Sequence, residues 1–398
     1  MYDVAVIGAG PAGSTAARYL AKFGMKVCLI DKDRFPRDKP CGGGFSQRLI
    51  DDFPYLRKRT DDFLKGIARV GVLHSPNRRI NLQGRVDMAV TLRTDFDNVL
   101  FESAIEQGLE PIIGKRAVSI RTYDRECEVQ LKGGQSIRAS VIVGSDGVSS
   151  LIARETDLNR KWNSSKLTAC RVVEVPTKYD DIIDRYSEDL YYHFFANIEG
   201  FPGYGWIFPK QDTINIGLGI VSTHAKGLPK IFDSFVSYLK KENLLMDDSD
   251  ISQAKGALVP TGGPLDRSYR NNCLLVGDSA GMVSPLTGGG IAYAMSAARF
   301  AALVLTRALE LEEYNTLALH NYEQLWRNDF GNEFKRQLLA QRLFTSPFTN
   351  LLFEIGRRDK GLQEIVSNGM AESSQEGIDL KLLTFRTMFV CLKAALRI

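Results

Sequence analysis

A glycine-rich loop near the start of the chain has the residue types and the spacing that bind phosphate groups. Gly8, Gly10 and Gly13 follow a short apolar run and precede a segment with helical periodicity. The first glycine permits a tight turn, the second lets the backbone approach a pyrophosphate, and the third lets helix and strand pack closely. Because a helix N-terminus then faces the phosphates, the loop, which includes Pro11 and Ala12, predicts a dinucleotide site.

Acidic residues and further glycines follow later apolar runs. Asp31 and Lys32 follow the next run, where the carboxylate would accept hydrogen bonds from ribose hydroxyls. Two later runs stop at Asp146, within Gly-Ser-Asp-Gly, and at Gly277-Asp278. A last cluster opens a helix, and its residues are Pro285, Gly288, Gly289, Gly290 and Ile291. The first loop alone does not distinguish FAD from NAD, so the later segments must decide between these two cofactors.

Together these segments resemble the flavoprotein superfamily of p-hydroxybenzoate hydroxylase, which implies that the chain binds FAD. The resemblance implies that Asp278 contacts the ribityl chain and that the helix opening at Gly290 points its dipole at the flavin pyrimidine. It also implies that Arg93 lies beside FAD. The predicted cofactor-binding residues from these segments are Gly8, Gly10, Pro11, Ala12, Gly13, Asp31, Lys32, Arg93, Asp146, Gly277, Asp278, Pro285, Gly288, Gly289, Gly290 and Ile291.

Two further segments resemble the geranylgeranyl reductase family. One is Lys-Pro-Cys-Gly-Gly-Gly at 39–44, the other is Gly-Tyr-Gly-Trp-Ile-Phe-Pro-Lys at 203–210, and Ala-Leu-Val-Pro-Thr at 257–261 also agrees. The resemblance extends to about residue 300. It implies that Cys41 and Gly42 lie near the flavin and belong to the cofactor site. It implies a channel for an isoprenoid chain, with the predicted substrate-binding residues Tyr204, Trp206, Phe208 and Pro209.

The activity that this resemblance implies is the FAD-dependent saturation of C=C bonds in geranylgeranyl chains. The substrates would be archaeal-type membrane ether lipids or a related polyprenyl compound. Reduced flavin supplies a hydride, and an alkene also needs a proton on its other carbon. We therefore name Cys41 and Tyr204 as candidate catalytic residues, with a water in the channel as a third proton source. A dry, apolar channel would protect the reduced flavin from wasteful reoxidation.

Structural readings of the same residues stay open at this stage. Tyr204, Trp206 and Phe208 alternate along one strand and so point to one face, which fits ordinary sheet core as well as a ligand wall. Cys41 is compatible with two roles, that of a small buried hydrophobic residue and that of a residue near the flavin. Arg93 on its own also fits a surface ion pair.

Two other functions are compatible with the same fold. One is an FAD monooxygenase or halogenase, although halogenases have Trp-x-Trp-x-Ile-Pro where this chain reads Tyr-Gly-Trp-Ile-Phe-Pro at 204–209. The other is an electron-transfer flavoprotein that reduces a quinone, against which the lack of cluster-forming cysteines weighs. No second Gly-x-Gly-x-x-Gly follows a strand, so we expect an external electron donor, either NAD(P)H or reduced ferredoxin.

The elements that must position these residues are those of an α/β fold. Runs 2–7 and 26–30, with the helical segment 14–23 between them, form a right-handed βαβ unit of a Rossmann-type domain. Alternating runs elsewhere predict a β-rich substrate domain, and the end of the chain is helical. We predict a discontinuous FAD-binding domain, a substrate domain and a helical C-terminal region, with the bounds 1–70, 91–160 and 259–300; 71–90 and 161–258; and 301–398.

Composition excludes some classes of function. The 398 residues, 44% hydrophobic and 25% charged, carry a net charge of +4, too slight for a nucleic-acid partner. The six cysteines are scattered without a C-x-x-C pair, so no metal site is predicted and reduced thiols are expected. The four histidines have no recognisable catalytic setting and are interpreted as structural. The oligomeric state is left open.

The end of the chain bears on localisation. No signal peptide and no membrane-spanning run is recognised, so a cytoplasmic protein is expected. In segment 382–398, Arg386, Lys393 and Arg397 fall on one side of an otherwise apolar helix. That pattern predicts peripheral contact with the inner face of a membrane, and it equally fits a helix docked on the protein body or in a dimer.

Overall fold

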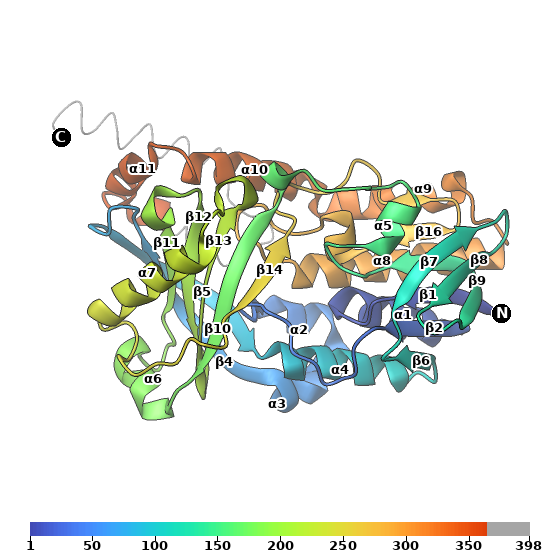
Figure 1. The fold of residues 1–398 in the computed structure, drawn as a ribbon, viewed down its shortest axis with the longest axis horizontal. Coiled ribbons are helices and arrows are strands. Elements are labelled where there is room, and N and C mark those ends of the chain that lie inside the picture. The colour runs from blue at the N-terminus through green and yellow to red at the C-terminus, as the bar shows by residue number, and fades with distance from the viewer. Residues whose placement is uncertain (364–398) are drawn as a thin grey trace.

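The computed structural model describes residues 1–363 as two β-sheets that lie side by side along the long axis of the molecule, with helices packed around them (Figure 1). The sheet that begins at the N-terminus carries the phosphate-binding loop, and the other sheet carries segment 203–210. The predicted α/β class is confirmed. The predicted helix over 382–398 lies outside the described residues and stays a prediction.

The first sheet is mainly parallel. Its strands follow the order β15-β16-β9-β1-β2-β6, and the neighbouring pairs from β16 to β6 are parallel, while β7 and β8 extend β9 as an antiparallel hairpin. Its central strands are apolar on both faces, as expected for a sheet covered by helices on both sides. The strand bounds are β1 Tyr2–Ile7, β2 Val27–Asp31, β6 Glu110–Ile113, β7 Ala117–Thr122, β8 Cys127–Leu131, β9 Ser136–Gly144, β15 Tyr269–Arg270 and β16 Cys273–Leu275.

Helices with small residues at their contacts pack on this sheet. Helix α1 begins at Pro11, three residues before the predicted start, because proline suits the first helical position. It packs against α4 and α8, and α8 packs against α9. Within residues 1–363, α8 alone is long and apolar enough to span a membrane, but half of its most apolar stretch is buried. The helix bounds are α1 Pro11–Lys22, α4 Arg93–Ile105, α5 Leu151–Glu155, α8 Ile291–Glu310 and α9 Thr316–Trp326.

The second sheet is mainly antiparallel and follows the order β14-β10-β13-β12-β11-β4-β5-β3, with only β11 and β4 parallel. The strand bounds are β3 Gly44–Ser46, β4 Leu64–His74, β5 Asn81–Thr91, β10 Thr168–Pro176, β11 Tyr192–Ala196, β12 Gly203–Pro209, β13 Thr213–Val221 and β14 Lys255–Val259. The boundary predicted at residue 70 falls inside β4. Strand β3 and all of β4 belong to the second sheet, because each pairs with β5.

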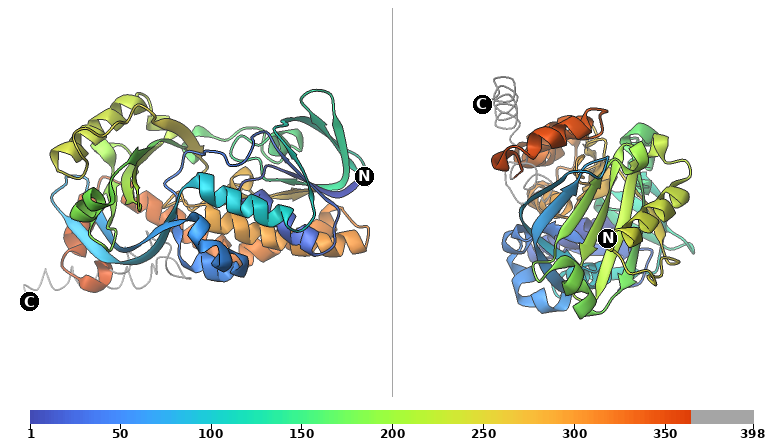
Figure 2. Two further views of the ribbon diagram at one scale, coloured as in Figure 1. Left: turned by 90° about the horizontal axis from the view of Figure 1, so that it is seen from below. Right: turned by 90° about the vertical axis from the view of Figure 1, so that its left-hand side faces the viewer.

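Further helices cover the second sheet and join it to the first. Helix α7 packs on β10 and β13, and α11 contacts β5, over the edge of the sheet (Figure 2). The C-terminal region is helical as predicted as far as residue 363, and it packs on both sheets, since α9 contacts the first and α11 the second. The bounds of these helices and of the connecting ones are α2 Arg48–Asp52, α3 Thr60–Phe63, α6 Tyr179–Tyr186, α7 Leu228–Lys241, α10 Asn332–Phe344 and α11 Thr349–Gly356.

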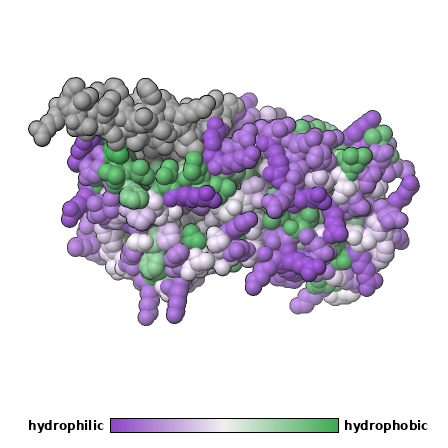
Figure 3. All heavy atoms as spheres, turned by 90° about the horizontal axis from the view of Figure 1, so that it is seen from above, coloured by the Kyte–Doolittle hydropathy of each residue, from purple (hydrophilic) through white to green (hydrophobic). Residues whose placement is uncertain are grey.

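Hydrophobic side chains are exposed at the surface around α10 and α11. Figure 3 shows them gathered at the end that carries α10 and α11. The large exposed side chains of these two helices and of the turn between them are Leu339, Leu343, Phe348 and Leu351.

Two buried histidines lie side by side in the second sheet. His74 on β4 and His193 on β11 share a hydrogen bond of 2.8 Å between Nε2 and Nδ1, and His74 stacks on Phe195 at 4.1 Å between ring centroids. Burial lowers the pKa of His74 to about 3 and that of His193 to about 4. Both rings are therefore neutral at physiological pH, which agrees with a structural role.

This pair should make the folded state sensitive to acid. The unfolded chain takes up protons as pH falls below about 6.5, whereas the buried rings stay neutral until about pH 4, so stability present above pH 6.5 is lost on acidification. We expect a loss of about 1 to 2 kcal/mol per histidine between pH 6.5 and 5.

The variant His74→Phe keeps the stack on Phe195 and should reduce this pH dependence, measured as the change in urea midpoint between the two pH values. His224→Gln, which replaces an exposed histidine, is the control and should show the same change in urea midpoint as the wild type. A pH dependence that His74→Phe leaves unchanged would exclude the pair as its source.

Candidate functional site

The phosphate-binding loop requires glycine at two of its three positions for steric reasons. Gly8 has a φ of +99°, and a side chain there would overlap the backbone at Ser145. A Cβ at Gly13 would overlap the carbonyl oxygen of Gly8. A Cβ at Gly10 would meet only the Arg37 guanidinium, 3.4 Å away. Gly10 thus faces free space beside a cation, which suits the close approach of a pyrophosphate.

Helix α1 presents open donors toward this space. Its N-cap is Gly10, which offers no side-chain cap, so the first N–H groups of the helix stay available for a ligand. Ala12 lies against Gly277, whose ideal Cβ would be 3.2 Å from the Cβ of Ala12. The two glycine segments that the sequence places far apart therefore meet at the start of α1.

Asp31 lies at the end of β2 next to the same loop. Its carboxylate accepts a hydrogen bond of 2.6 Å from the N–H of Ala9 and one of 2.8 Å from the N–H of Asp33. The carboxylate is thereby fixed at the loop, where it can also accept from ribose hydroxyls. Lys32 instead lies at the surface and forms an ion pair with Asp33 at 3.4 Å. Nothing in this geometry directs Lys32 toward the cofactor site.

Asp278 and the start of α8 form the other side of the cofactor site. Asp278 lies in a short 3-10 turn, Gly277–Ala280, and its carboxylate would be 3.3 Å from a Cβ at Gly290. Gly290 is the N-cap of α8 and offers no side-chain cap. Lys39, from the segment that also carries Cys41, reaches Asp278 at 3.8 Å. These contacts connect the last glycine cluster with segment 39–44.

Arg93 is buried rather than at the surface, so the interpretation as a surface ion pair is wrong. It donates two hydrogen bonds of 2.7 Å to Asp97, and Arg37 reaches the same carboxylate at 3.1 Å. Burial acts to lower the pKa of Arg93, but the Asp97 carboxylate outweighs it and the pKa is raised. The Cys41 thiol lies beside the same guanidinium. Arg93 therefore carries a permanent positive charge between the loop and the thiol.

Asp146 has a local structural role in this structure. Its carboxylate accepts hydrogen bonds from the Ser150 hydroxyl, at 2.5 Å, and from the N–H groups of Leu151 and Ile152 at the start of α5. Burial raises the pKa of Asp146, and these hydrogen bonds oppose the increase. Its oxygens are thus directed at α5, and what reaches the phosphate-binding loop is the Asp146 backbone, close to Gly8.

The residues of this region fit FAD. An uncapped helix N-terminus, a backbone-lined space beside Arg37, a fixed carboxylate at Asp31 and a second uncapped helix at Gly290 surround one site. Phosphates, ribose and a flavin ring would each find the donors or acceptors that they require. When bound here in its reduced form, FAD would supply a hydride to a substrate.

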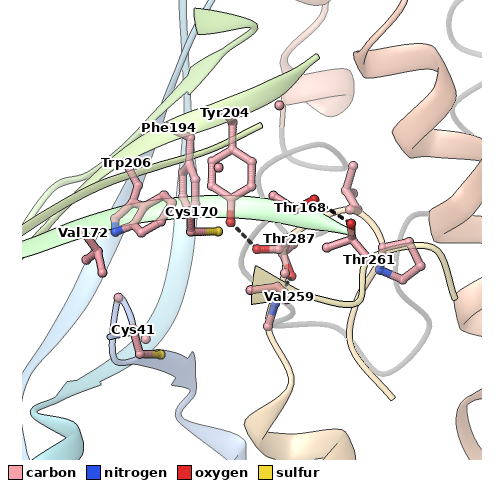
Figure 4. A pocket seen from close by; sticks show the side chains of 18 of the residues that line it. Cys41, Thr168, Cys170, Val172, Phe194, Tyr204, Trp206, Val259, Thr261 and Thr287 are labelled. Atoms are coloured by element: carbon pink, nitrogen blue, oxygen red, sulfur yellow. Dashed lines mark hydrogen bonds between the residues drawn. The ribbon is translucent and has the colours of Figure 1, made fainter. Parts of the chain in front are cut away.

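An apolar pocket of about 180 Å³ opens next to these residues. Figure 4 shows Trp206, Phe194 and Tyr204 on strands of the second sheet, with Cys41 on its loop across from them. Of the predicted cofactor residues, Cys41, Gly42, Pro285, Gly288 and Gly289 line it. The cofactor site and the pocket therefore share two loops, 40–44 and 285–289.

The strand β12 forms the aromatic wall of this pocket. Tyr204, Trp206 and Phe208 all line it, because alternate residues of a strand share one face. Pro209, also predicted to bind substrate, lies on the opposite face of the strand and is not among the residues that line this pocket, so its role stays a prediction. The Tyr204 hydroxyl donates to the carbonyl of Thr287, which joins the wall to loop 285–289.

Other pocket residues were not singled out from the sequence. Cys170 and Val172 on β10, Leu286, and Phe344 on α10 also line the pocket. None of them lies in a recognisable motif, so only the pairing of β10 with β13 and β14 could place Cys170 and Val172 there. In segment 257–261, Ala257, Val259 and Thr261 line the pocket, as the period of a strand requires.

The glycine geometry predicts two separable defects. Gly13→Ala should destabilise the fold by at least about 2 kcal/mol, because its methyl group overlaps backbone. Gly10→Ala meets no backbone atom, so it should melt close to the wild type yet bind FAD at least about tenfold more weakly. Thermal melting and flavin absorbance after gel filtration measure the two effects.

Gly256→Ala is the control, since the nearest atom to its Cβ would be 3.9 Å away, and it should change neither quantity. Wild-type FAD affinity in Gly10→Ala would show that the phosphates do not lie at this glycine.

The comparisons with known proteins agree with this geometry. A family model described as an FAD binding domain matches residues 1–325. The digeranylgeranylglycerophospholipid reductase of Methanocaldococcus jannaschii is 30% identical over 335 residues, which cover 82% of this chain and 82% of that protein.

Solved structures show the same fold. A geranylgeranyl bacteriochlorophyll reductase-like protein from Thermoplasma acidophilum superposes with a TM-score of 0.80 at 22% identity, covering 97% of this chain and 95% of that chain. A flavin-dependent brominase superposes with a TM-score of 0.72 at 15% identity, covering 100% and 99%. At these identities the structures establish the fold alone. The family match, the 30% identity over most of both chains and the site geometry together place this chain in the geranylgeranyl reductase family of FAD-dependent flavoproteins.

Proposed function

We propose that this protein uses reduced FAD to saturate C=C bonds in the geranylgeranyl chains of a membrane ether lipid or a related polyprenyl compound. The observation that carries the proposal is the apolar pocket that shares loops 40–44 and 285–289 with the cofactor site. Its lining is dominated by aliphatic and aromatic side chains, which suit a long apolar ligand. The reductase names of the relatives support the same chemistry.

Cys41 is the proton source that we favour. It lines the pocket, its sulfur accepts from the N–H of Gly43 at 3.4 Å, and the Arg93 guanidinium lies beside it. A cation next to a thiol stabilises the thiolate that remains after the proton is given to the alkene. Tyr204 also lines the pocket, but its hydroxyl proton is directed at the Thr287 carbonyl. We therefore assign Tyr204 to the wall and keep it as the second candidate.

The walls of the pocket also serve the reaction by excluding water. Trp206 and Phe208 are buried, and their rings lie next to one another with centroids 6.1 Å apart. An isolated alkene accepts a hydride poorly, so the proton must arrive before or together with the hydride. A dry pocket keeps reduced flavin from other reactions while the chain is positioned. The electrons come from an external donor, either NAD(P)H or reduced ferredoxin.

Anaerobic reduction tests the proposal directly. The protein is reduced with dithionite without oxygen and mixed with a geranylgeranylated ether lipid. We expect flavin reoxidation together with a lipid mass gain of about 2 Da for each double bond saturated. Reoxidation that requires oxygen would instead favour a monooxygenase or halogenase, whose fold this chain shares. Reoxidation by a quinone with unchanged lipid would favour an electron-transfer protein.

Replacement of the thiol tests the assignment of the proton source. Cys41→Ala should keep FAD and lower kcat about 10²- to 10⁴-fold, since a positioned acid contributes on that order. Cys41→Ser should fall between this variant and the wild type. Cys170→Ala is the matched comparison, because Cys170 is a thiol in the same pocket whose role in the wall should appear in KM rather than kcat. Wild-type kcat in both Cys41 variants would remove Cys41 from the mechanism.

A further inference from the structure

A buried amide lies behind the wall of the pocket, at Asn215 on β13. Its strand reads Thr-Ile-Asn-Ile-Gly-Leu-Gly-Ile-Val, and Asn215 is only 1% exposed. Asparagine is depleted in strands, and burial of its amide costs free energy unless hydrogen bonds compensate. An apolar residue would serve a sheet core better. The amide therefore has a role that packing does not explain.

The hydrogen bonds of Asn215 join three parts of the site. The indole N–H of Trp206 donates to Oδ1 at 2.7 Å, and Nδ2 donates to the carbonyl of Cys41 at 3.0 Å and to Glu174 at 2.7 Å. The indole only donates, while the carbonyl and the carboxylate accept, so the orientation of the amide is determined by its partners. One side chain thus connects the aromatic wall with the loop that carries the thiol.

An ion pair between a buried lysine and a partly exposed carboxylate holds this amide in place. Lys210 is fully buried, and its ammonium group donates to Glu174 Oε1, the same oxygen that accepts from Asn215. Burial lowers the pKa of Lys210, and the Glu174 carboxylate opposes that decrease. Glu174 and Asn215 are also direct partners across β10 and β13. Glu174 therefore accepts one N–H of the Asn215 amide, and the other N–H donates to the Cys41 carbonyl.

The Cys41 loop depends on such an anchor. Glycines at 42–44 leave its backbone conformational freedom, and Gly43 has a φ of +73°. Further backbone ties lie after the thiol, where the N–H of Thr91 donates to the carbonyl of Gly43 at 2.9 Å and Gly44 pairs with Val90. Gly42 packs directly on the wall, since a Cβ there would lie 2.7 Å from the Phe208 ring.

We propose that Asn215 is a positioning residue, which fixes the distance between the Cys41 thiol and the aromatic wall through its hydrogen bonds to the Cys41 carbonyl and the Trp206 indole. This inference rests on the proposed function for its effect on turnover. Its structural content, the restraint of the Cys41 loop, is independent of the substrate and is measured separately. A displacement of about 1 Å at a reacting group can reduce turnover about 100-fold, so the effect should be large.

A swap of two side chains tests the proposal. Asn215→Asp combined with Glu174→Gln exchanges amide and carboxylate, keeps the total charge beside Lys210 and restores a hydrogen bond between positions 174 and 215. The carboxylate at position 215 still accepts from Trp206 but no longer donates to the Cys41 carbonyl. The single variant Asn215→Asp is the comparison, because it adds the charge repulsion that the double variant removes.

We expect the double variant to bind FAD and to melt close to the wild type, whereas its kcat falls at least about tenfold and its KM stays within about threefold. The rate at which iodoacetamide modifies Cys41, followed by mass spectrometry of the Cys41 peptide, should rise at least about threefold because the loop opens more often. Wild-type kcat together with a wild-type modification rate would overturn the proposal.

The two proposals fail in different ways. If the wild-type enzyme does not saturate the lipid, the proposed function fails, and the modification rate of Cys41 alone decides the role of Asn215. If the double variant loses FAD, Trp206→Phe replaces it, since this change removes the hydrogen bond to Oδ1 and keeps a smaller aromatic ring in the wall. An unchanged modification rate of Cys41 in Trp206→Phe would then overturn the inference.

Discussion

The close contact between segment 40–44 and the second sheet is the constraint on which the site depends. Gly42 packs on Phe208 so tightly that a methyl group would lie 2.7 Å from its ring, and Gly43 adopts a left-handed backbone conformation against Thr91. This contact brings the thiol of Cys41 to the pocket while the same segment, through Lys39, reaches the cofactor residues. Side chains at these glycines would push the Cys41 loop away from the second sheet and so move the thiol relative to the pocket.

The two buried cations beside the Cys41 loop each have a carboxylate partner. Arg93 is held by Asp97, which more than offsets the desolvation of its guanidinium, and Lys210 is held by Glu174, which offsets part of the cost of burying the ammonium group. Both ion pairs lie near the Cys41 loop: Arg93, at the start of α4, lies beside the thiol, and Lys210, which follows β12, lies close to Gly43. Hydrophobic substitutes could match the packing, but they could not orient a thiol or an amide. In this protein the polar groups specify geometry, and the surrounding apolar residues supply most of the stability.

The pocket itself is a consequence of strand periodicity. Alternate residues of β12 face it, and the adjacent strand β13 presents the small residue Gly219 opposite Tyr204. Gly217 has the same function behind Trp206, since a Cβ there would overlap the indole ring. Space for an apolar chain therefore comes from pairing large and small residues across the sheet. The polar cluster around Asn215 lies just beyond this space and behind its wall.

Local sequence determined much of the fold and the identity of the cofactor. The βαβ unit at the start of the chain follows from periodicity and from glycines whose steric role is local, and the predicted helical segment 14–23 lies almost wholly within α1. Segments 39–44 and 203–210 also pointed to the pocket, because their composition is unusual enough to resemble one family. The tertiary structure decided the rest.

Long-range pairing cannot be inferred from local patterns, so the sequence did not reveal that β3 and β4 join the second sheet or that Pro209 faces away from the pocket. Asp146 looked like a cofactor ligand because it follows a strand, yet its carboxylate bonds to α5. Asn215 was not predicted to be functional. It is a single polar residue in an apolar strand, and its role depends on Trp206 and Cys41, which only folding places beside it. Residue type and spacing thus determined the chemistry that is available, and the pairing of distant strands decided which groups meet.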